Sequence, residues 1–309
     1  MKRTLLALGL CSLLFACKKS STDDDPGNNP GNNPSGPALS ATDVQHDMAA
    51  GKTTYYFTVS GVNNPALTVP AAGTGQTWNF STLPTTLRDT TVLSPVPPVG
   101  SGFPAGAFYS SEKRVYGTGA NTQSITVLTY QEVSASGWLH LARALPAFIL
   151  AYPGIGELEY EAQLPNYTPA LPMTPPFPVR LNDSVNINTT ITENAKADAP
   201  GAGLTNAPTA QRTTYTGKVK AIATGTVTLP GYAAPLNALV LRRDLTIREN
   251  YFLNGAPASP LLLQALGLTD GETFTATYYD FYNYGGVGYL GTIVAQGSAV
   301  SWARFRRAN

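Results

Sequence analysis

The sequence has few charged residues and almost no histidine or cysteine. Only 13% of its 309 residues are charged, and 20 basic side chains stand against 19 acidic ones. A chain without a one-sided positive field lacks the attraction to phosphate that nucleic-acid binding requires, so no nucleic-acid partner is expected. The scarcity of charge, together with 29 Gly, 25 Pro and 16 Tyr, also excludes a helical bundle or a coiled coil.

The usual catalytic patterns are missing from the sequence. It contains two histidines, His46 and His140, and no HxH, HExxH or Gly-x-Ser-x-Gly pattern, which argues against a zinc enzyme and against a serine hydrolase. The glycine-rich segments 117–119 and 285–288 do not open a helix after a strand, so a nucleotide-binding loop is not expected. No compact catalytic set is therefore visible in the sequence.

The N-terminus has the pattern of a secretory signal. Residues 1–16 place two basic residues before an apolar run that is too short to span a bilayer permanently. Cys17 follows a small residue and resembles the cysteine of the bacterial lipobox, which is acylated on sulfur and becomes the new N-terminus. We therefore expect a lipoprotein anchored in the outer membrane through Cys17. Cys11 lies in the removed segment, so neither a disulfide nor a cysteine-ligated metal is expected in the mature domain.

Residues 17–38 are expected to form the lipidated cysteine and a disordered tether. Residues 18–25 (KKSSTDDD) look like the short acidic export signal of surface lipoproteins in Bacteroidetes-type bacteria. That likeness implies a position on the cell surface, and a periplasm-facing position is the alternative. Residues 26–37 repeat PGNN and have no large apolar side chain to bury, which is typical of an extended linker.

From residue 39 onward the dominant period is two. Apolar residues at Val185, Ile187 and Ile191 alternate with polar ones, as in a strand with one buried face. In the segment 239–247 the apolar residues also occupy alternate positions, but Arg243 interrupts this apolar face. Strands are predicted at 53–59, 124–133, 157–163, 185–192, 218–229, 239–247, 272–284, 288–295 and 298–306, and short helices at 40–50 and 260–266.

Alternating strands with almost no helix between them exclude βαβ units. We therefore predict an all-β fold within residues 39–309, built as one or two antiparallel β-sandwiches with long Pro/Gly loops. Clusters of Gly and Pro, such as 95–106 and 165–178, predict these loops. If there are two sub-domains, the division is expected within 165–178.

Three segments resemble a broad group of uncharacterised secreted β-rich proteins of Bacteroidetes-type bacteria. They are Asp47-Met48 with residues 73–81 (GTGQTWNFS), residues 176–184 (PFPVRLNDS), and residues 225–230 (GTVTLP) with 237–242 (NALVLR). The resemblance implies a secreted or surface location and a β architecture. It implies no activity and no catalytic residue.

Two groups of side chains are candidate binding sites. Period two puts Glu157, Glu159 and Glu161 on one face of a strand, where they could hold Ca²⁺ or form a solvated, edge-protecting face. The second group contains three tyrosines and an aspartate on one face of the strand 272–284. Its members are Tyr278, Asp280, Tyr282 and Tyr284. They would form a stacking platform for sugar rings or peptide if exposed, and an aromatic core if buried.

These observations predict a lipid-anchored, non-catalytic protein of the cell envelope. Its expected role is to bind a ligand, with a glycan as first choice, or to act structurally with another envelope protein. The alternative is a secreted glycoside hydrolase or other hydrolase that uses Glu157, Glu159 or Glu161 with a partner acid such as Asp280.

The predicted anchor depends on one atom, the sulfur of Cys17. Replacing Cys17 by alanine should release the protein from membranes, because the acyl chains would have no attachment site. Membrane fractionation measures this, with Cys11→Ala as the matched control that stays bound. Retention of Cys17→Ala in the membrane fraction would contradict the prediction.

Overall fold

The computed structural model describes residues 36–46, 52–61, 64–86, 88–95, 103–104, 106–118 and 121–308. The expected signal peptide, Cys17 and nearly all of the tether lie outside the described residues, as do Asp47-Met48 and most of the loop at 95–106. Gly36–Asn309 forms one compact unit. No helix in the described part of the chain is long and apolar enough to cross a membrane.

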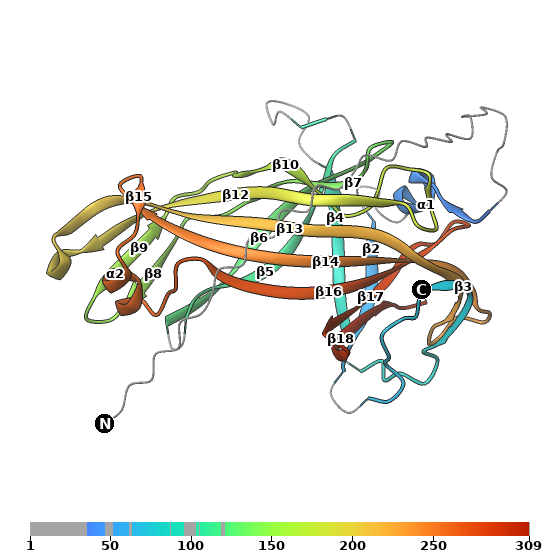
Figure 1. Ribbon diagram of the computed structural model, residues 1–309. Coiled ribbons are helices and arrows are strands. Elements are labelled where there is room, and N and C mark those ends of the chain that lie inside the picture. Colours follow the sequence, from blue (N-terminus) through green and yellow to red (C-terminus); the bar gives the residue numbers. More distant parts are fainter. Residues whose placement is uncertain are drawn as a thin grey trace, which may run out of the picture. The chain divides into compact units, whose positions relative to one another are not determined.

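Twelve strands of the described chain close into an antiparallel barrel (Figure 1). Each strand is hydrogen-bonded to the next around the wall, and β12 pairs with β13 to complete the circle. In order around the wall the strands are β13 (Leu204–Thr228), β14 (Leu236–Leu253), β16 (Glu272–Asn283), β17 (Gly288–Gln296), β18 (Ala299–Arg306), β2 (Thr53–Ser60), β4 (Arg88–Pro95), β5 (Phe108–Thr118), β6 (Asn121–Ser134), β7 (Gly137–Ala144), β10 (Asn166–Pro172) and β12 (Ser184–Ala199).

The all-β class is confirmed, but the predicted β-sandwich is wrong because the main sheet closes on itself. Alternating apolar and polar residues identify strands with one buried face, and both architectures contain such strands. The difference lies in pairings that the alternation does not specify: β10 bridges β7 and β12. β10 also lies within 165–178, where a cluster of prolines predicts a loop.

Each predicted strand coincides at least in part with an observed one, and both short helices are present. They are α1 (Ala41–Gln45) and α2 (Pro260–Ala265). α1 begins with the capping box that its sequence indicates. The Ser40 hydroxyl accepts from the Asp43 amide at 3.2 Å, and the Asp43 carboxylate accepts from the Ser40 amide at 2.8 Å.

Several short elements lie outside the twelve-stranded wall. A hairpin of two of these strands extends the sheet from β12, and one strand runs parallel to β13. The turn between β14 and its short partner uses Asn254 and Gly255, both with positive φ, as the Asn-Gly pair predicts. The elements are β1 (Ala38–Leu39), which pairs with β11 (Val179–Arg180), β3 (Gly73–Asn79), β8 (Phe148–Tyr152), β9 (Gly156–Tyr160), β15 (Ala256–Pro257) and the 3₁₀ helix η1 (Pro200–Ala202).

Both faces of β16 are buried, each in a different hydrophobic core. Tyr282 points into the barrel and contacts Trp138 of the opposite wall with ring centroids 6.4 Å apart. Phe281 points outward, where Trp78 and Phe80 cover it edge-on at 5.3 and 5.8 Å. β3 and the segment after it therefore form a cover over the outside of the barrel wall.

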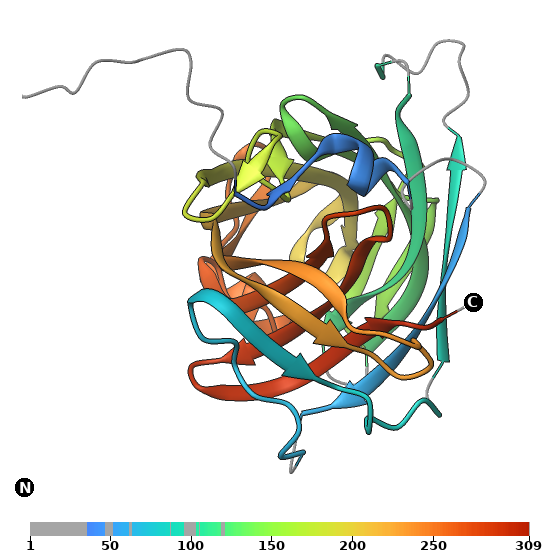
Figure 2. The ribbon, with the colours of Figure 1, turned by 90° about the vertical axis from the view of Figure 1, so that its right-hand side faces the viewer.

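The two ends of the barrel differ. In Figure 2, which views the molecule from the side on which α1 lies, the strands form a ring with α1 near its rim. Leu39 and Val44 are fully buried there and belong to the interior core. At the opposite end, Tyr116 of β5, Phe148 of β8 and Tyr160 of β9 pack in a separate cluster. The first end is packed, and the second contains the cavity described below.

The parallel contact of β3 with β13 requires glycine at position 225. A Cβ on Gly225 would lie 1.9 Å from the carbonyl oxygen of Gln76 in β3. Gly225→Ala should therefore push β3 away and destabilise the protein by about 1–3 kcal/mol. Gly201→Ala is the control, because a Cβ there meets nothing within 4 Å. Urea unfolding compares the two, and equal stabilities would contradict the role given to this contact.

Candidate functional site

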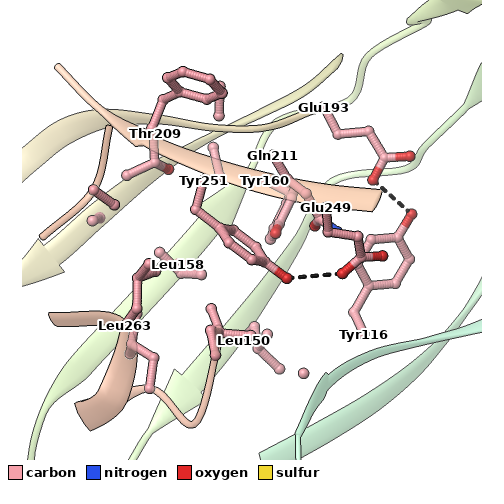
Figure 3. Close-up of a pocket in the computed structure, with 18 of the residues that line it drawn as sticks. Tyr116, Leu150, Leu158, Tyr160, Glu193, Thr209, Gln211, Glu249, Tyr251 and Leu263 are labelled. Atoms are coloured by element: carbon pink, nitrogen blue, oxygen red, sulfur yellow. Dashed lines mark hydrogen bonds between the residues drawn. The ribbon is translucent and has the colours of Figure 1, made fainter. Parts of the chain in front are cut away.

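A cavity of about 420 Å³ lies at the end of the barrel where β8, β9 and α2 are found. β5, β12, β13 and β14 complete its wall (Figure 3). The lining combines aliphatic side chains, tyrosines and a small number of charged groups. The cavity wall is therefore partly apolar and partly polar, and the two kinds of side chain lie in different parts of it.

The cavity has room because β12 carries small side chains on its inner face. Ala195, Ala197 and Ala199 occupy alternate positions of the strand and all line the cavity. Alternate residues of a strand point to the same side, so these three methyl groups face the interior together. Leu150 of β8 and Leu158 of β9 supply larger aliphatic surface. The strand is not interrupted here, so the free volume is due to the small size of these alanine side chains.

The floor of the cavity is a buried ion pair. Arg143 of β7 donates through Nη1 to Glu193 of β12 at 2.6 Å, and both side chains are at most 5% exposed. Nη2 of Arg143 donates to the hydroxyl oxygens of Tyr167 at 2.8 Å and Tyr215 at 3.2 Å. The second carboxylate oxygen of Glu193 accepts from Tyr116 at 3.1 Å. Five side chains from five strands therefore form one network across the barrel.

Tyr116 and Tyr167 of this network stay protonated at neutral pH. Burial, reinforced by the charge of Glu193, raises the pKa of Tyr116. Burial also raises the pKa of Tyr167 to about 12, although Arg143 opposes the shift. Burial alone would lower the pKa of Arg143, but Tyr167, Tyr215 and Glu193 outweigh it and the pKa is raised. The phenols consequently act as hydrogen-bond partners of a fixed ion pair.

A second carboxylate lies in the cavity above the floor. The hydroxyl of Tyr251 donates to Glu249 at 2.9 Å, and both side chains come from the inner face of β14 (Figure 3). Leu263 of α2 and Tyr160 of β9 contribute to the same cavity wall. Burial, followed by the charge of Glu249, raises the pKa of Tyr251. Tyr251 therefore keeps its proton and its hydrogen bond to the carboxylate.

The predicted tyrosine group faces the barrel interior, away from the cavity lining. Asp280 is 2% exposed and pairs with Arg243 at 3.3 Å, and Arg243 lies over the Tyr278 ring at 4.3 Å from its centroid. Tyr282 is fully buried, while Tyr278 and Tyr284 are partly buried against the same core. The charge of Arg243 within an apolar face is thus matched by Asp280 across the β14–β16 ladder. The role of this group in ligand binding stays a prediction.

The predicted glutamate group, two residues of β9 and Glu161 just after it, is exposed to solvent, and Glu157 of this group also borders the cavity. Glu157, Glu159 and Glu161 are exposed, whereas Leu158 and Tyr160 between them point toward the cavity. Glu161 forms an ion pair with Lys196 of β12. In the part of the chain that the structure describes, no group of three or more His, Cys, Asp or Glu is placed to hold a metal ion. The glutamates and the buried Asp280 lie on opposite sides of the barrel wall.

Sequence reasoning did not identify the residues of the floor or the second carboxylate. Glu193 stands two positions after Ile191 on the mostly apolar face of its strand, which marks a buried charge that needs a partner. The alternating alanines that follow are a second signal, because small residues on a buried face leave space. The partner itself, Arg143, lies 50 residues away in the chain and could be found only from the fold.

Comparison of the chain with family models, with curated proteins and with solved structures gave no match. The fold and the site define a closed antiparallel β-barrel with an apolar-walled cavity at one end and an ion-paired floor. The geometry of this cavity is the basis for assigning a function.

The floor predicts a specific pattern of stabilities. Arg143→Met should lower the free energy of unfolding by about 3–5 kcal/mol, because Glu193 would remain buried without its cation. The double variant Arg143→Met, Glu193→Met should recover most of that loss, since no buried charge remains. Urea unfolding at pH 7 measures both. A single variant as stable as the parent would contradict the account of the floor.

Proposed function

We propose that this protein binds a small amphipathic molecule in the end cavity of the barrel without altering it chemically. The observation that carries the proposal is a cavity of about 420 Å³ with aliphatic and aromatic walls above an ion-paired floor. Ligand sites commonly have such volumes, are mostly apolar, and contain a few polar groups that orient the ligand. A molecule with an apolar body and one polar end matches this division.

The contacts of the polar groups favour binding over catalysis. Arg143 and Glu193 are paired with each other, and Tyr116, Tyr167 and Tyr215 add three further hydrogen bonds to the pair. A nucleophile or a general base requires a group with access to substrate and a suitable pKa. The raised pKa values of Tyr116 and Tyr167 do not provide such a group. The floor therefore serves to close the cavity and to orient what enters it.

An amphipathic molecule fits this site better than the glycan expected from the tyrosine face. Tyr282 and Asp280 are enclosed by the interior core and offer no open platform for a sugar ring. Leu150, Leu158 and Leu263 instead give the cavity an aliphatic wall, which excludes water more effectively than a glycan site would. The ligand class proposed here follows from that wall.

The proposed location is the cell envelope. A lipid on Cys17 would hold the protein at the outer membrane, and residues 17–38 would act as the tether between the lipid and the barrel. We propose the surface-exposed orientation, with the periplasm-facing one as the alternative. In either orientation the barrel would remain within reach of amphipathic molecules that leave a membrane.

Binding in the cavity can be tested with N-phenyl-1-naphthylamine, a neutral apolar dye whose fluorescence rises in a dry site. The parent protein should bind the dye with one saturable site. Ala195→Phe should weaken binding by at least about tenfold, because the new ring occupies the cavity next to β9.

The matched control is Ala151→Phe, which adds the same ring at an exposed position of β8. This variant should bind the dye as the parent does. Circular dichroism confirms that both variants are folded. An absence of saturable binding by the parent, or equal binding by Ala195→Phe, would overturn the proposed function.

A further inference from the structure

The charges that line the cavity do not balance. Arg143 is paired with Glu193 at 2.6 Å, and Arg114 of β5 is paired with Glu112 at 2.7 Å. These are the only cationic side chains that line the cavity among the described residues. Each therefore already has its carboxylate. Three other carboxylates line the cavity, and Glu249 is the least exposed of Glu157, Glu249 and Glu272.

Glu249 is a cavity carboxylate whose only described side-chain partner is neutral. It accepts from Tyr251 at 2.9 Å, and none of the ion pairs between described residues includes it. Arg248 precedes it in β14 but occupies the exposed, outward-facing position of the strand. Glu249 is paired across the ladder with Thr213, one inward-facing position nearer the floor than Tyr251. A half-buried carboxylate consequently lies in the cavity wall, directly opposite Glu272 of β16, with no cation paired to it among the described residues.

Aromatic rings accompany this carboxylate. Tyr160 lines the same cavity as Glu249, with one face of its ring stacked on Phe148 at 4.4 Å between centroids. Tyr251 contacts Glu249 directly. Tyrosine faces attract cations through the ring quadrupole, most strongly in sites that exclude water. A carboxylate in a cavity wall that also contains tyrosine rings is a suitable environment for an ammonium group.

The mouth of the cavity carries the same sign. Glu157 and Glu272 line it and are exposed, and Glu272 is the residue directly opposite Glu249 in the β14–β16 ladder. An anionic head group would meet these charges on entry and Glu249 inside, whereas a cationic one would be attracted at each step. A neutral alcohol could fill the apolar part but would leave Glu249 without a counter-charge.

We propose that the ligand of the cavity is a cationic amphiphile, an aliphatic or aromatic molecule with an ammonium head that pairs with Glu249. This inference rests on the proposed function and specifies its ligand class. The ammonium group pairs with Glu249 beside Tyr251, whose hydroxyl donates to the same carboxylate. The apolar body extends along Leu158 and Leu263 toward the mouth.

The test displaces bound N-phenyl-1-naphthylamine with three eight-carbon competitors: octylamine, octanol and octanoate at pH 7. They share the apolar chain and differ in the charge of the head. Octylamine should compete at least about tenfold better than octanol, and octanoate should be the weakest, since a hydrogen bond between charged partners is stronger than one to a neutral group.

Glu249→Gln keeps the shape of the side chain and an acceptor for Tyr251 but removes the charge. It should weaken octylamine by about tenfold and leave octanol unchanged. Glu159→Gln is the control, because it removes the same charge from the outer face of β9. It should change none of the three affinities.

The outcomes separate the two proposals. Saturable dye binding with no preference for octylamine, or a preference that survives Glu249→Gln, overturns the cationic ligand and leaves amphiphile binding intact. A stronger competition by octanoate than by octylamine also overturns it. An absence of dye binding by the parent overturns the proposed function itself.

Discussion

The rest of the structure depends on the continuous antiparallel pairing of β12, β13 and β14. β13 is 25 residues long and pairs with β14 along nearly its whole length. Along this one strand Val227 lies in the outer core beneath β3, Val219 in the barrel interior and Thr209 in the cavity wall. A shift of one residue in this register would turn every one of these side chains to the other face. The pairing therefore fixes the packed cores and the cavity together.

The Arg143–Glu193 pair divides the interior into a packed part and an open part. Toward α1 the barrel is filled by large side chains such as Tyr282 and Leu241, while on the other side small alanines leave free volume. A buried ion pair costs desolvation, which its direct contact and three tyrosine hydroxyls offset. Because these partners come from separate strands, the pair also favours one arrangement of the wall. The site is thus shaped by the same network that positions the strands.

Much of the fold could be predicted from the sequence because its strands are long and alternate strictly. Three predicted features depend only on residues close together in the chain, and each is found in the structure. They are the buried odd-numbered face of 185–191, the capping box at Ser40 and the Asn254-Gly255 turn. Barrel closure could not be predicted, since β10 joins two strands through few ladder pairs and its prolines suggest a loop. The site was missed for the same reason. Arg143, Glu193 and Glu249 become neighbours of one cavity only after distant strands pair.

The central claim is that an amphiphile occupies the end cavity with its head near Glu249 and its chain toward the mouth. The most direct measurement is a crystal structure of the protein with 8-bromooctylamine, using anomalous scattering to locate the bromine. The account predicts one bromine site inside the cavity, near Leu158 and Leu263, with the amine at Glu249. Bromine found only on the outer surface, or among the side chains packed beneath α1, would contradict it.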